Sequence, residues 1–355
     1  MQSFALTVSK TEERHYAEVC ADHFLNVANE WEIKDKVTML GTDSARNMVA
    51  AARLLPFEHM PCMAHILQRT VTVSLNDSAF ERALAKCRKI VGHFKHSPAN
   101  AQELKEQQAA HGHQTEPLVQ DVPTRWNSTL EMIKRIQRNK SGLTTILTQQ
   151  NSKVTMLTDQ ELDRLQKLQE LLEPCRYVTE LLGGERYVSC SMVLPALCHL
   201  FRIMEPSDDD PVYVLRWASV HDLLMAETDA HQPSAQTTEE PSPKKSKMSI
   251  SLLGSPDSDT EEEEDAIDCC LNLYKAEPKI DIGECPLQWW LKREGAHARL
   301  APIARKYLST PATTVPCERL FSLSGHIIQK KRASLSSDNV NRIVCLSNWL
   351  SAKKD

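Results

Sequence analysis

Apolar side chains recur at three- and four-residue spacings along most of the chain, and this spacing is typical of amphipathic helices. The clearest example runs from residue 12 to residue 31, with apolar positions at Tyr16, Val19, Cys20, Phe24, Val27 and Trp31. Similar patterns predict helices over residues 44–54, 62–75 and 159–182, and helices without strands from 77 to 149. Five more are predicted towards the C-terminus, over residues 267–274, 287–294, 298–308, 316–328 and 339–350.

Three short runs rich in β-branched and aromatic residues interrupt this pattern near the N-terminus. They cover residues 3–8, 37–40 and 57–60, and each predicts a short strand. Because these strands alternate with helices, the N-terminal part has an α/β pattern. The predicted fold class is therefore α/β, mostly helical.

Composition excludes several classes of protein. The 355 residues include only 10 glycines, and none of them forms a GxGxxG or GxxxxGK[ST] arrangement, which argues against a dinucleotide site and a P-loop. No apolar run reaches the ~18 residues of a membrane helix, and no signal peptide precedes residue 20. Eleven cysteines without a CxxC pair suggest reduced, mostly buried thiols. We expect a soluble intracellular protein with no membrane partner and no small-molecule substrate.

Charge is unevenly distributed along the chain. The net charge is −5, yet residues 227–265 alone carry −8, so the remainder carries +3. This acidic stretch is rich in Ser, Pro and Glu and poor in large apolar residues, which predicts a disordered linker over residues 226–265. It also contains Pro243-Lys244-Lys245-Ser246-Lys247, a short basic motif that favours a location in the nucleus.

Two carboxylates lie where an α/β fold could use them. Asp43 follows the predicted strand 37–40, so it is either a metal ligand at the carboxyl end of a strand or an N-cap of the next helix. Glu318 lies in the first turn of the predicted helix 316–328, where the helix dipole already favours an acidic residue. Local sequence alone favours the structural role for both.

A second group of residues could bind zinc or DNA. Cys62 and His65 form a CxxH pair, but no finger-like spacing supplies two further ligands, so packing at a helix start is the favoured role. Trp126 follows Arg125 and precedes Lys134 and Arg135, a grouping that could stack on a base and hold phosphates, although a core tryptophan beside a solvated basic face fits equally. A second basic cluster consists of Lys330, Lys331 and Arg332.

The order of these motifs is more specific than any one of them. The motifs are Trp31 six residues before Val37, TDSARNM from Thr42, CMAH from Cys62, RWNS from Arg125, and LLEP from Leu171 followed by ELLGG from Glu180. Together with residues 286–350 they resemble the hAT superfamily of DNA transposases. Within it the chain is similar to transposase-derived BED-type zinc finger proteins, although no BED finger is present.

This resemblance implies an RNase H-like core, interrupted by a long all-α insertion, that holds two divalent metals on an Asp, Asp, Glu triad. Asp43 would correspond to the second aspartate, Glu318 to the glutamate, Trp126 to a tryptophan that stacks on DNA, and Cys62 with His65 to the family's CxxH motif. The first aspartate and the first strands have no counterpart in this sequence. We therefore expect a catalytically inactive protein without cofactor; Mg²⁺ or Mn²⁺ would bind only if upstream sequence completed the triad.

The resemblance also divides the chain into four segments: a partial RNase H-like core (1–100), a helical insertion (101–225), the linker (226–265) and a C-terminal dimerisation region (266–355). The candidate dimerisation residues are Trp289, Trp290, Leu320, Phe321, Ile327, Leu346 and Trp349. Trp289 and Trp290 either divide between the chain's own core and a partner or are both covered within the chain. We expect a homodimer with residual DNA contacts; the alternatives are a fragment of an active transposase and a helical scaffold that binds protein alone.

Overall fold

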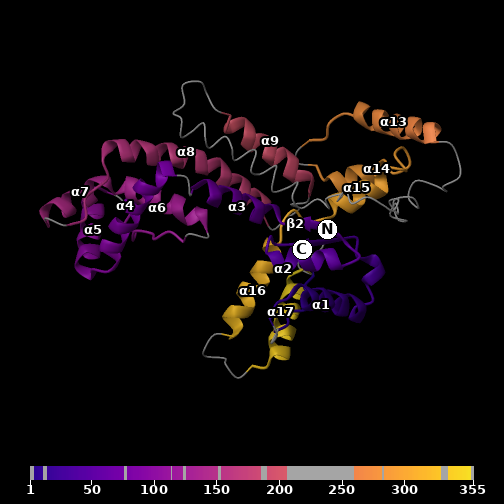
Figure 1. Cartoon of the computed structure of the whole chain (residues 1–355), viewed down its shortest axis with the longest axis horizontal. Coiled ribbons are helices and arrows are strands. Elements are labelled where there is room, and N and C mark those ends of the chain that lie inside the picture. The colour runs from indigo at the N-terminus through magenta and orange to yellow at the C-terminus, as the bar shows by residue number, and fades with distance from the viewer. Residues whose placement is uncertain are drawn as a thin grey trace, which may run out of the picture. The chain divides into compact units, whose positions relative to one another are not determined.

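The computed structural model describes residues 4–10, 14–75, 78–112, 114–122, 125–150, 153–184, 190–205, 260–281, 284–328 and 335–352 (Figure 1). Most of them are helical, which confirms the predicted mostly helical class. The chain divides into two compact units. Unit 1 combines Met1–Cys62 and Gly184–Leu194 with Gln232–Asp355, and unit 2 combines Met63–Gly183 with Pro195–His231. No helix in the described part is both long and apolar enough to cross a membrane.

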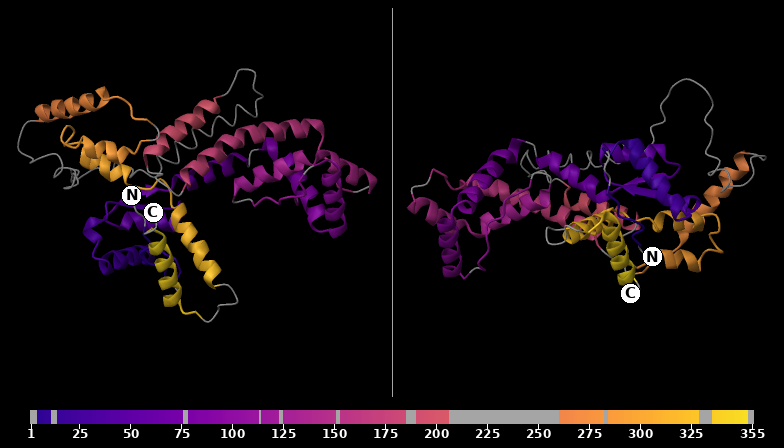
Figure 2. Two further views of the ribbon diagram at one scale, coloured as in Figure 1. Left: turned by 180° about the vertical axis from the view of Figure 1, so that it is seen from behind. Right: turned by 90° about the horizontal axis from the view of Figure 1, so that it is seen from below.

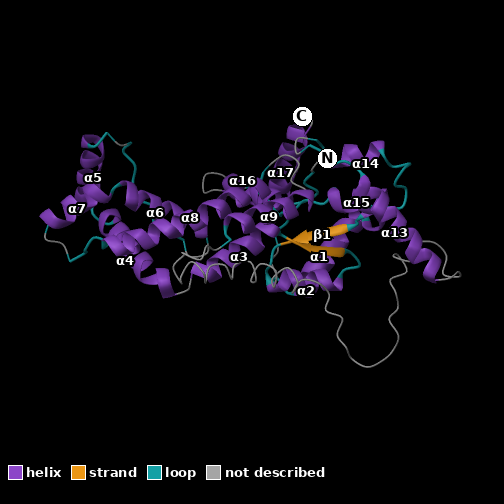
Figure 3. Cartoon of the chain, turned by 90° about the horizontal axis from the view of Figure 1, so that it is seen from above, coloured by secondary structure: helices purple, strands orange, loops and turns teal. Residues whose placement is uncertain are grey.

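A small parallel sheet lies at the centre of the N-terminal part of unit 1. Strand β1 (Met39–Thr42) pairs in parallel with β2 (Glu58–Pro61), so that Met39 lies opposite Glu58 and Thr42 opposite Pro61 (Figure 3). Helix α2 (Arg46–Leu54) makes the crossover that a parallel pair requires. Helix α1 (Ala17–Glu30) packs on α2, and the short 3₁₀ turn η1 (Lys34–Lys36) leads into β1.

Small side chains allow α1 and α2 to approach closely. Ala21 on α1 and Ala51 on α2 are buried together with Leu55, and the partly buried side chains around them are Ala17, Cys20, Phe24, Leu25, Leu40 and Phe57. Two of the three strand predictions are confirmed with a shift of one or two residues, because β1 and β2 begin later than the predicted runs at 37 and 57.

The strand predicted at residues 3–8 is wrong. The described N-terminal segment, residues 4–10, belongs to no strand and instead lies along helix α17 (Ser337–Ala352). The backbone N–H of Ala5 donates to Asn348 Oδ1 at 2.7 Å, and that of Val8 donates to Asn341 Oδ1 at 2.8 Å. The Trp349 indole N–H donates to the Ala5 carbonyl at 2.8 Å. Side chains of a helix thus replace the neighbouring strand, which the β-branched pattern could not reveal.

The C-terminal part of unit 1 contains five helices among its described residues, as the spacing predicted: α13 (Thr260–Ala276), α14 (Pro286–Lys292), α15 (Ala301–Leu308), α16 (Val315–Ile328) and α17. Helix α13 begins at Thr260, so the end of the predicted linker is wrong: its last six residues are helical. Glu is a good helix former and acidic residues are favoured in a first turn. The rest of the linker, including the basic motif at 243–247, lies outside the described residues.

Two small cores stabilise this region. Helices α16 and α17 run antiparallel (Figure 2) and bury Ile327 against Val340 and Val344. Helices α14 and α15 bury Trp289 and Trp290 against Ala301. The ring of Tyr274 lies 5.0 Å from that of Trp290, and the buried His297 ring stacks on Trp289 at 6.0 Å.

Among the described residues of unit 2, all the named elements are helices; an isolated β-bridge joins Val122 and Arg125. The unit contains α3 (Met63–Leu75), α4 (Ser78–Lys95), α5 (Pro98–Ala110), α6 (Trp126–Arg138), α7 (Lys140–Gln149), α8 (Asp159–Leu182) and most of α9 (Val193–Ile203). Helix α8 packs against α3, α4 and α6, and α5 packs against α7. Gly142 of α7 lies close to α5, because a Cβ at this position would lie 3.1 Å from Gln107 Cβ.

The N-terminus of α8 is fixed by a capping box. Thr158 Oγ1 accepts the Glu161 N–H at 3.3 Å, while Glu161 Oε2 accepts the Thr158 N–H at 2.9 Å and the Lys86 ammonium at 2.7 Å. Burial disfavours the charged form of Glu161, but the hydrogen bonds from Lys86 and Thr158 outweigh it and hold the pKa of this carboxyl below its usual value. The carboxylate therefore stabilises the fold.

We expect Glu161→Gln to lower the free energy of unfolding by about 1–2 kcal/mol at pH 7, because it removes a charge-assisted hydrogen bond and weakens the cap. A carboxyl whose pKa is lowered by folding contributes fully above its unfolded pKa of about 4.3 and loses that contribution as the pH falls through its folded pKa. Urea unfolding at pH 7 and below pH 4 should show the difference between variant and wild type shrinking in acid. Glu170→Gln, on the exposed face of the same helix, should differ from wild type by less than about 0.5 kcal/mol at both pH values.

Candidate functional site

The carboxyl ends of β1 and β2 form one edge of the small sheet. Asp43 directly follows β1 and Cys62 directly follows β2, and the Cys62 N–H donates to the Thr42 carbonyl at 2.8 Å. The Thr42 hydroxyl also lies 2.8 Å from His59 Nε2 on the neighbouring strand. Because the strands are parallel, side chains that follow both strands lie at this same edge.

Helix α16 brings Glu318 to this edge from the C-terminal part of the chain. The Thr314 N–H donates to Cys62 Sγ at 3.2 Å, and α16 begins at the next residue. Glu318 lies in the first turn of α16, and its N–H donates to the Thr314 carbonyl at 3.2 Å. The contact with Cys62 therefore places the first turn of α16, which contains Glu318, at the edge where Asp43 follows β1.

Asp43 is not the N-cap that the local sequence favoured, because Ala45 takes that position in α2 without a side-chain cap; Asp43 instead stabilises the turn before this helix. It is half-buried, and its Oδ1 accepts the Ala45 N–H at 3.2 Å in the turn before α2. A metal pair of the type that the resemblance implies needs three carboxylates. The described residues contain no group of three or more His, Cys, Asp or Glu side chains placed to hold a metal ion. The described residues at this edge therefore do not supply that donor set.

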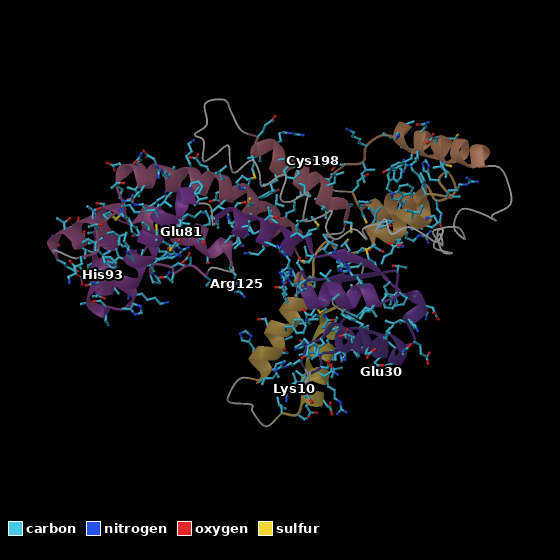
Figure 4. The ribbon with its side chains drawn as sticks, in the orientation of Figure 1. Lys10, Glu30, Glu81, His93, Arg125 and Cys198 are labelled. Carbon is cyan, nitrogen blue, oxygen red and sulfur yellow. The ribbon has the colours of Figure 1, made fainter. Side chains whose placement is uncertain are left out.

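The cysteines near this edge are packing residues. Cys62 is buried and accepts the Thr314 N–H, and Cys190 Sγ lies 2.9 Å from Met60 Sδ. Burial raises the pKa of the Cys190 thiol, so it is protonated at neutral pH and a poor nucleophile. All eleven cysteines are free thiols, but just four of them are buried, so the expectation that most are buried is wrong; Cys198 on α9, labelled in Figure 4, is one of three exposed ones. His65, the other member of the CxxH pair, is half-buried on α3.

The structure places Trp126 in the core of unit 2. Its side chain is 1% exposed at the start of α6, which packs on α3, α4, α7 and α8. Its indole N–H is buried without a hydrogen-bond partner among the described residues. In this conformation Trp126 cannot stack on a base, so the core alternative describes it. Arg125, labelled in Figure 4, remains exposed just before the helix.

Ion pairs neutralise the basic face of α6. Lys134 pairs with Glu173 on α8, and Arg135 pairs with Glu116. Arg138 reaches the same Glu116 carboxylate at 3.3 Å. Because these acidic partners are distant in the sequence, the sequence alone does not reveal that the basic residues of α6 are already paired. Lys330, Lys331 and Arg332, the second predicted basic cluster, lie outside the described residues.

The candidate dimerisation residues fall into buried and exposed groups. Trp289, Trp290 and Ile327 are buried, so both adjacent tryptophans are covered within the chain. Leu320 and Trp349 are partly buried, and the Trp349 ring meets Trp31 edge to face at 6.0 Å. Phe321 and Leu346 are exposed.

Sequence reasoning missed two groups of interacting residues. Asn341 and Asn348, which hold the N-terminal segment, are spaced seven residues apart on one face of α17, and this spacing is their one signal in the sequence. Glu277 joins Arg293 and the buried His297, each at 3.3 Å, while the Arg293 guanidinium lies 4.5 Å above the Trp289 ring. Nothing in the local sequence connects Glu277 with those partners.

Two family models match the chain. The ZBED1 RNase-like helical domain matches residues 60–171, and the hAT family C-terminal dimerisation region matches residues 270–350. An AC transposase of Zea mays is 22% identical over 428 aligned positions, which cover 97% of this chain and 52% of that protein. The AC9 transposase of Zea mays is 31% identical over 90 positions, 24% of this chain and 10% of its own.

A further relative is a human protein. Zinc finger BED domain-containing protein 4 of Homo sapiens is 21% identical over 312 positions, which cover 74% of this chain and 26% of that protein. The chain therefore spans about half of the first of these three relatives and a smaller part of the other two.

Proposed function

We propose that this chain, a hAT transposase-related protein with a dimerisation region, is a transposase-derived nuclear protein that forms homodimers and does not cut DNA by itself. The observation that carries the proposal is the match of residues 270–350 to the dimerisation region. The structure of this region supports the proposal, because helices α14 to α17 form two small cores and still expose large apolar side chains to solvent. The basic motif at 243–247 supports the nuclear location.

We propose that β1, α2 and β2 are part of an RNase H-like core. Three observations support this assignment. Strands β1 and β2 pair in parallel, Asp43 directly follows β1, and Glu318 lies in the first turn of the helix that begins at the same edge. The two carboxylates are then inherited positions. Asp43 accepts the Ala45 N–H in the turn before α2, a local role that a protein can retain after catalysis is lost.

An active transposase is the second candidate, favoured by the shared edge of Asp43 and Glu318. A third carboxylate supplied there would complete a donor set for Mg²⁺ or Mn²⁺. The two candidates differ in one measurement. Incubation of the full chain with labelled DNA ends of related elements and Mn²⁺ should give no cleavage or strand transfer under the first proposal, and cleavage that Glu318→Gln abolishes under the second.

Self-association should be measured on the full chain by size-exclusion chromatography with light scattering. We expect a dimer at micromolar concentration, while a monomer up to 50 times that concentration would contradict the first proposal. DNA binding should be tested over a range of salt concentrations, because phosphate contacts weaken steeply as salt rises. Salt-dependent binding would support residual DNA contact. No binding at low salt would favour a scaffold that binds protein alone, and the ion pairs of Lys134 and Arg135 on α6 are consistent with that outcome.

A further inference from the structure

The exposed face of α17 is unusually apolar. Ile343, Leu346 and Leu350 are 39%, 51% and 60% exposed and lie at i, i+3 and i+7, so they form one line along the helix, which we call the α17 stripe. From Ile343 to the end of the helix at Ala352 the sequence contains no charged residue. A solvated helix face usually carries several charges.

The other sides of α17 are already engaged within the chain. Val340 and Val344 pack against Ile327 of α16, and Asn341 and Asn348 bind the N-terminal segment. These contacts fix the orientation of the helix and leave the stripe on the side that faces solvent. Within the described part of the chain, the stripe remains exposed.

Helix α16 offers a weaker alternative. Phe321, Leu323 and Ile328 of this helix are also exposed. Their exposed neighbours, however, include Glu318, Arg319 and His326, three charged or titratable residues, and charged groups are depleted at the centres of protein interfaces. The α17 stripe has the three- and four-residue alternation of a coiled-coil seam, in which one helix packs against another along its length. The exposed residues that flank the stripe are Asn339, Arg342, Ser347 and Ser351, polar or charged groups suited to the rim of an interface.

We propose that the α17 stripe is the centre of a two-fold interface with the same stripe of a second copy of this chain. The inference rests on the proposed homodimer and specifies its contact. The stripe lies inside residues 270–350, the part that matches a dimerisation region. A two-fold interface uses the same patch on both copies, so each stripe residue contributes twice. A stable interface buries about 800 Å² on each partner, so neighbouring residues complete it around this apolar centre.

The test is Leu346→Asp combined with Leu350→Asp in the full chain, measured by sedimentation equilibrium. The double variant changes four leucine side chains in a two-fold interface. If at least three of them each contribute roughly tenfold, the dimer dissociation constant should rise by at least about 1,000-fold. Leu54→Asp is the matched control, because Leu54 is 56% exposed on α2 of the same unit and lies outside the matched region. It should leave dissociation unchanged.

The outcomes separate this inference from the proposal beneath it. A wild-type monomer would overturn both. A wild-type dimer that the double variant leaves intact would overturn the stripe alone, and its disruption by Phe321→Asp would move the interface to α16. If the double variant loses its circular dichroism signal, L346C decides instead: mild oxidation should give far more covalent dimer with L346C than with L54C, and equal yields would contradict the stripe.

Discussion

Replacing Trp126 by alanine is expected to lower the free energy of unfolding by about 3–5 kcal/mol, the cost of removing a large aromatic side chain from a packed core. The side chain is 1% exposed and sits where α6 meets α3, α4, α7 and α8. Trp126→Phe should be milder, because it retains most of the apolar contact and removes an indole N–H that has no partner among the described residues.

Chemical denaturation followed by circular dichroism would measure this loss, and hydrogen exchange should locate it in the helices of unit 2. Arg125→Ala is the control, since Arg125 is the exposed neighbour and should change stability by less than about 0.5 kcal/mol. A DNA-stacking tryptophan would behave in the opposite way. Trp126→Ala would then preserve stability and weaken DNA binding, and that result would contradict the core assignment.

Arg88→Met is expected to destabilise unit 2 by about 3 kcal/mol, because it would leave a buried carboxylate without its cation. The Asp121 side chain is 2% exposed, and Arg88 Nε and Nη2 each lie 2.9 Å from its Oδ2. Asp121 otherwise receives one hydrogen bond in the described structure, from the Gln120 amide at 3.0 Å. The pair joins α4 to the segment that leads into α6.

The double variant Arg88→Met, Asp121→Leu should be more stable than Arg88→Met alone, because it removes the stranded charge together with its partner. Urea unfolding of both single variants and the double variant completes the cycle. Lys167→Met serves as the control, since the Lys167 pair with Glu170 is exposed and worth less than about 0.5 kcal/mol. If Arg88→Met and the double variant lost the same free energy of unfolding, the Asp121 carboxylate would not need Arg88 as its cation.

The helices could be predicted from the sequence because their signal is local. The apolar period of 3.6 residues is set by the helix itself, and the predicted helix at 159–182 has the same bounds as α8. The strand predicted at residues 3–8 was wrong, because the hydrogen-bonding partners of this segment, Asn341 and Asn348, are distant in the sequence. A β-branched run favours extended backbone but does not say what accepts or donates its hydrogen bonds.

The candidate site shows the same limit. Asp43 and Glu318 were indicated by the resemblance, but their common edge depends on the contact between Cys62 and Thr314. The basic residues of α6 were equally compatible with a phosphate-binding surface and a solvated face, because the pairing of Lys134 with Glu173 and of Arg135 with Glu116 exists only after folding. Residue type predicts which interactions are available, and long-range packing decides which are used.

The attachment of residues 4–10 to α17 has a consequence for synthesis on the ribosome. Helices α3 to α8 lie in one continuous stretch of sequence, so unit 2 can begin to fold while the rest of the chain is still being made. Ala5 and Val8 are translated 343 and 333 residues before their partners Asn348 and Asn341. Such distant contacts are slow to form. Unit 1, whose N-terminal part precedes unit 2, should therefore be completed after unit 2 has begun to fold, and chaperones would meet it with the amides of Ala5 and Val8 still unpaired.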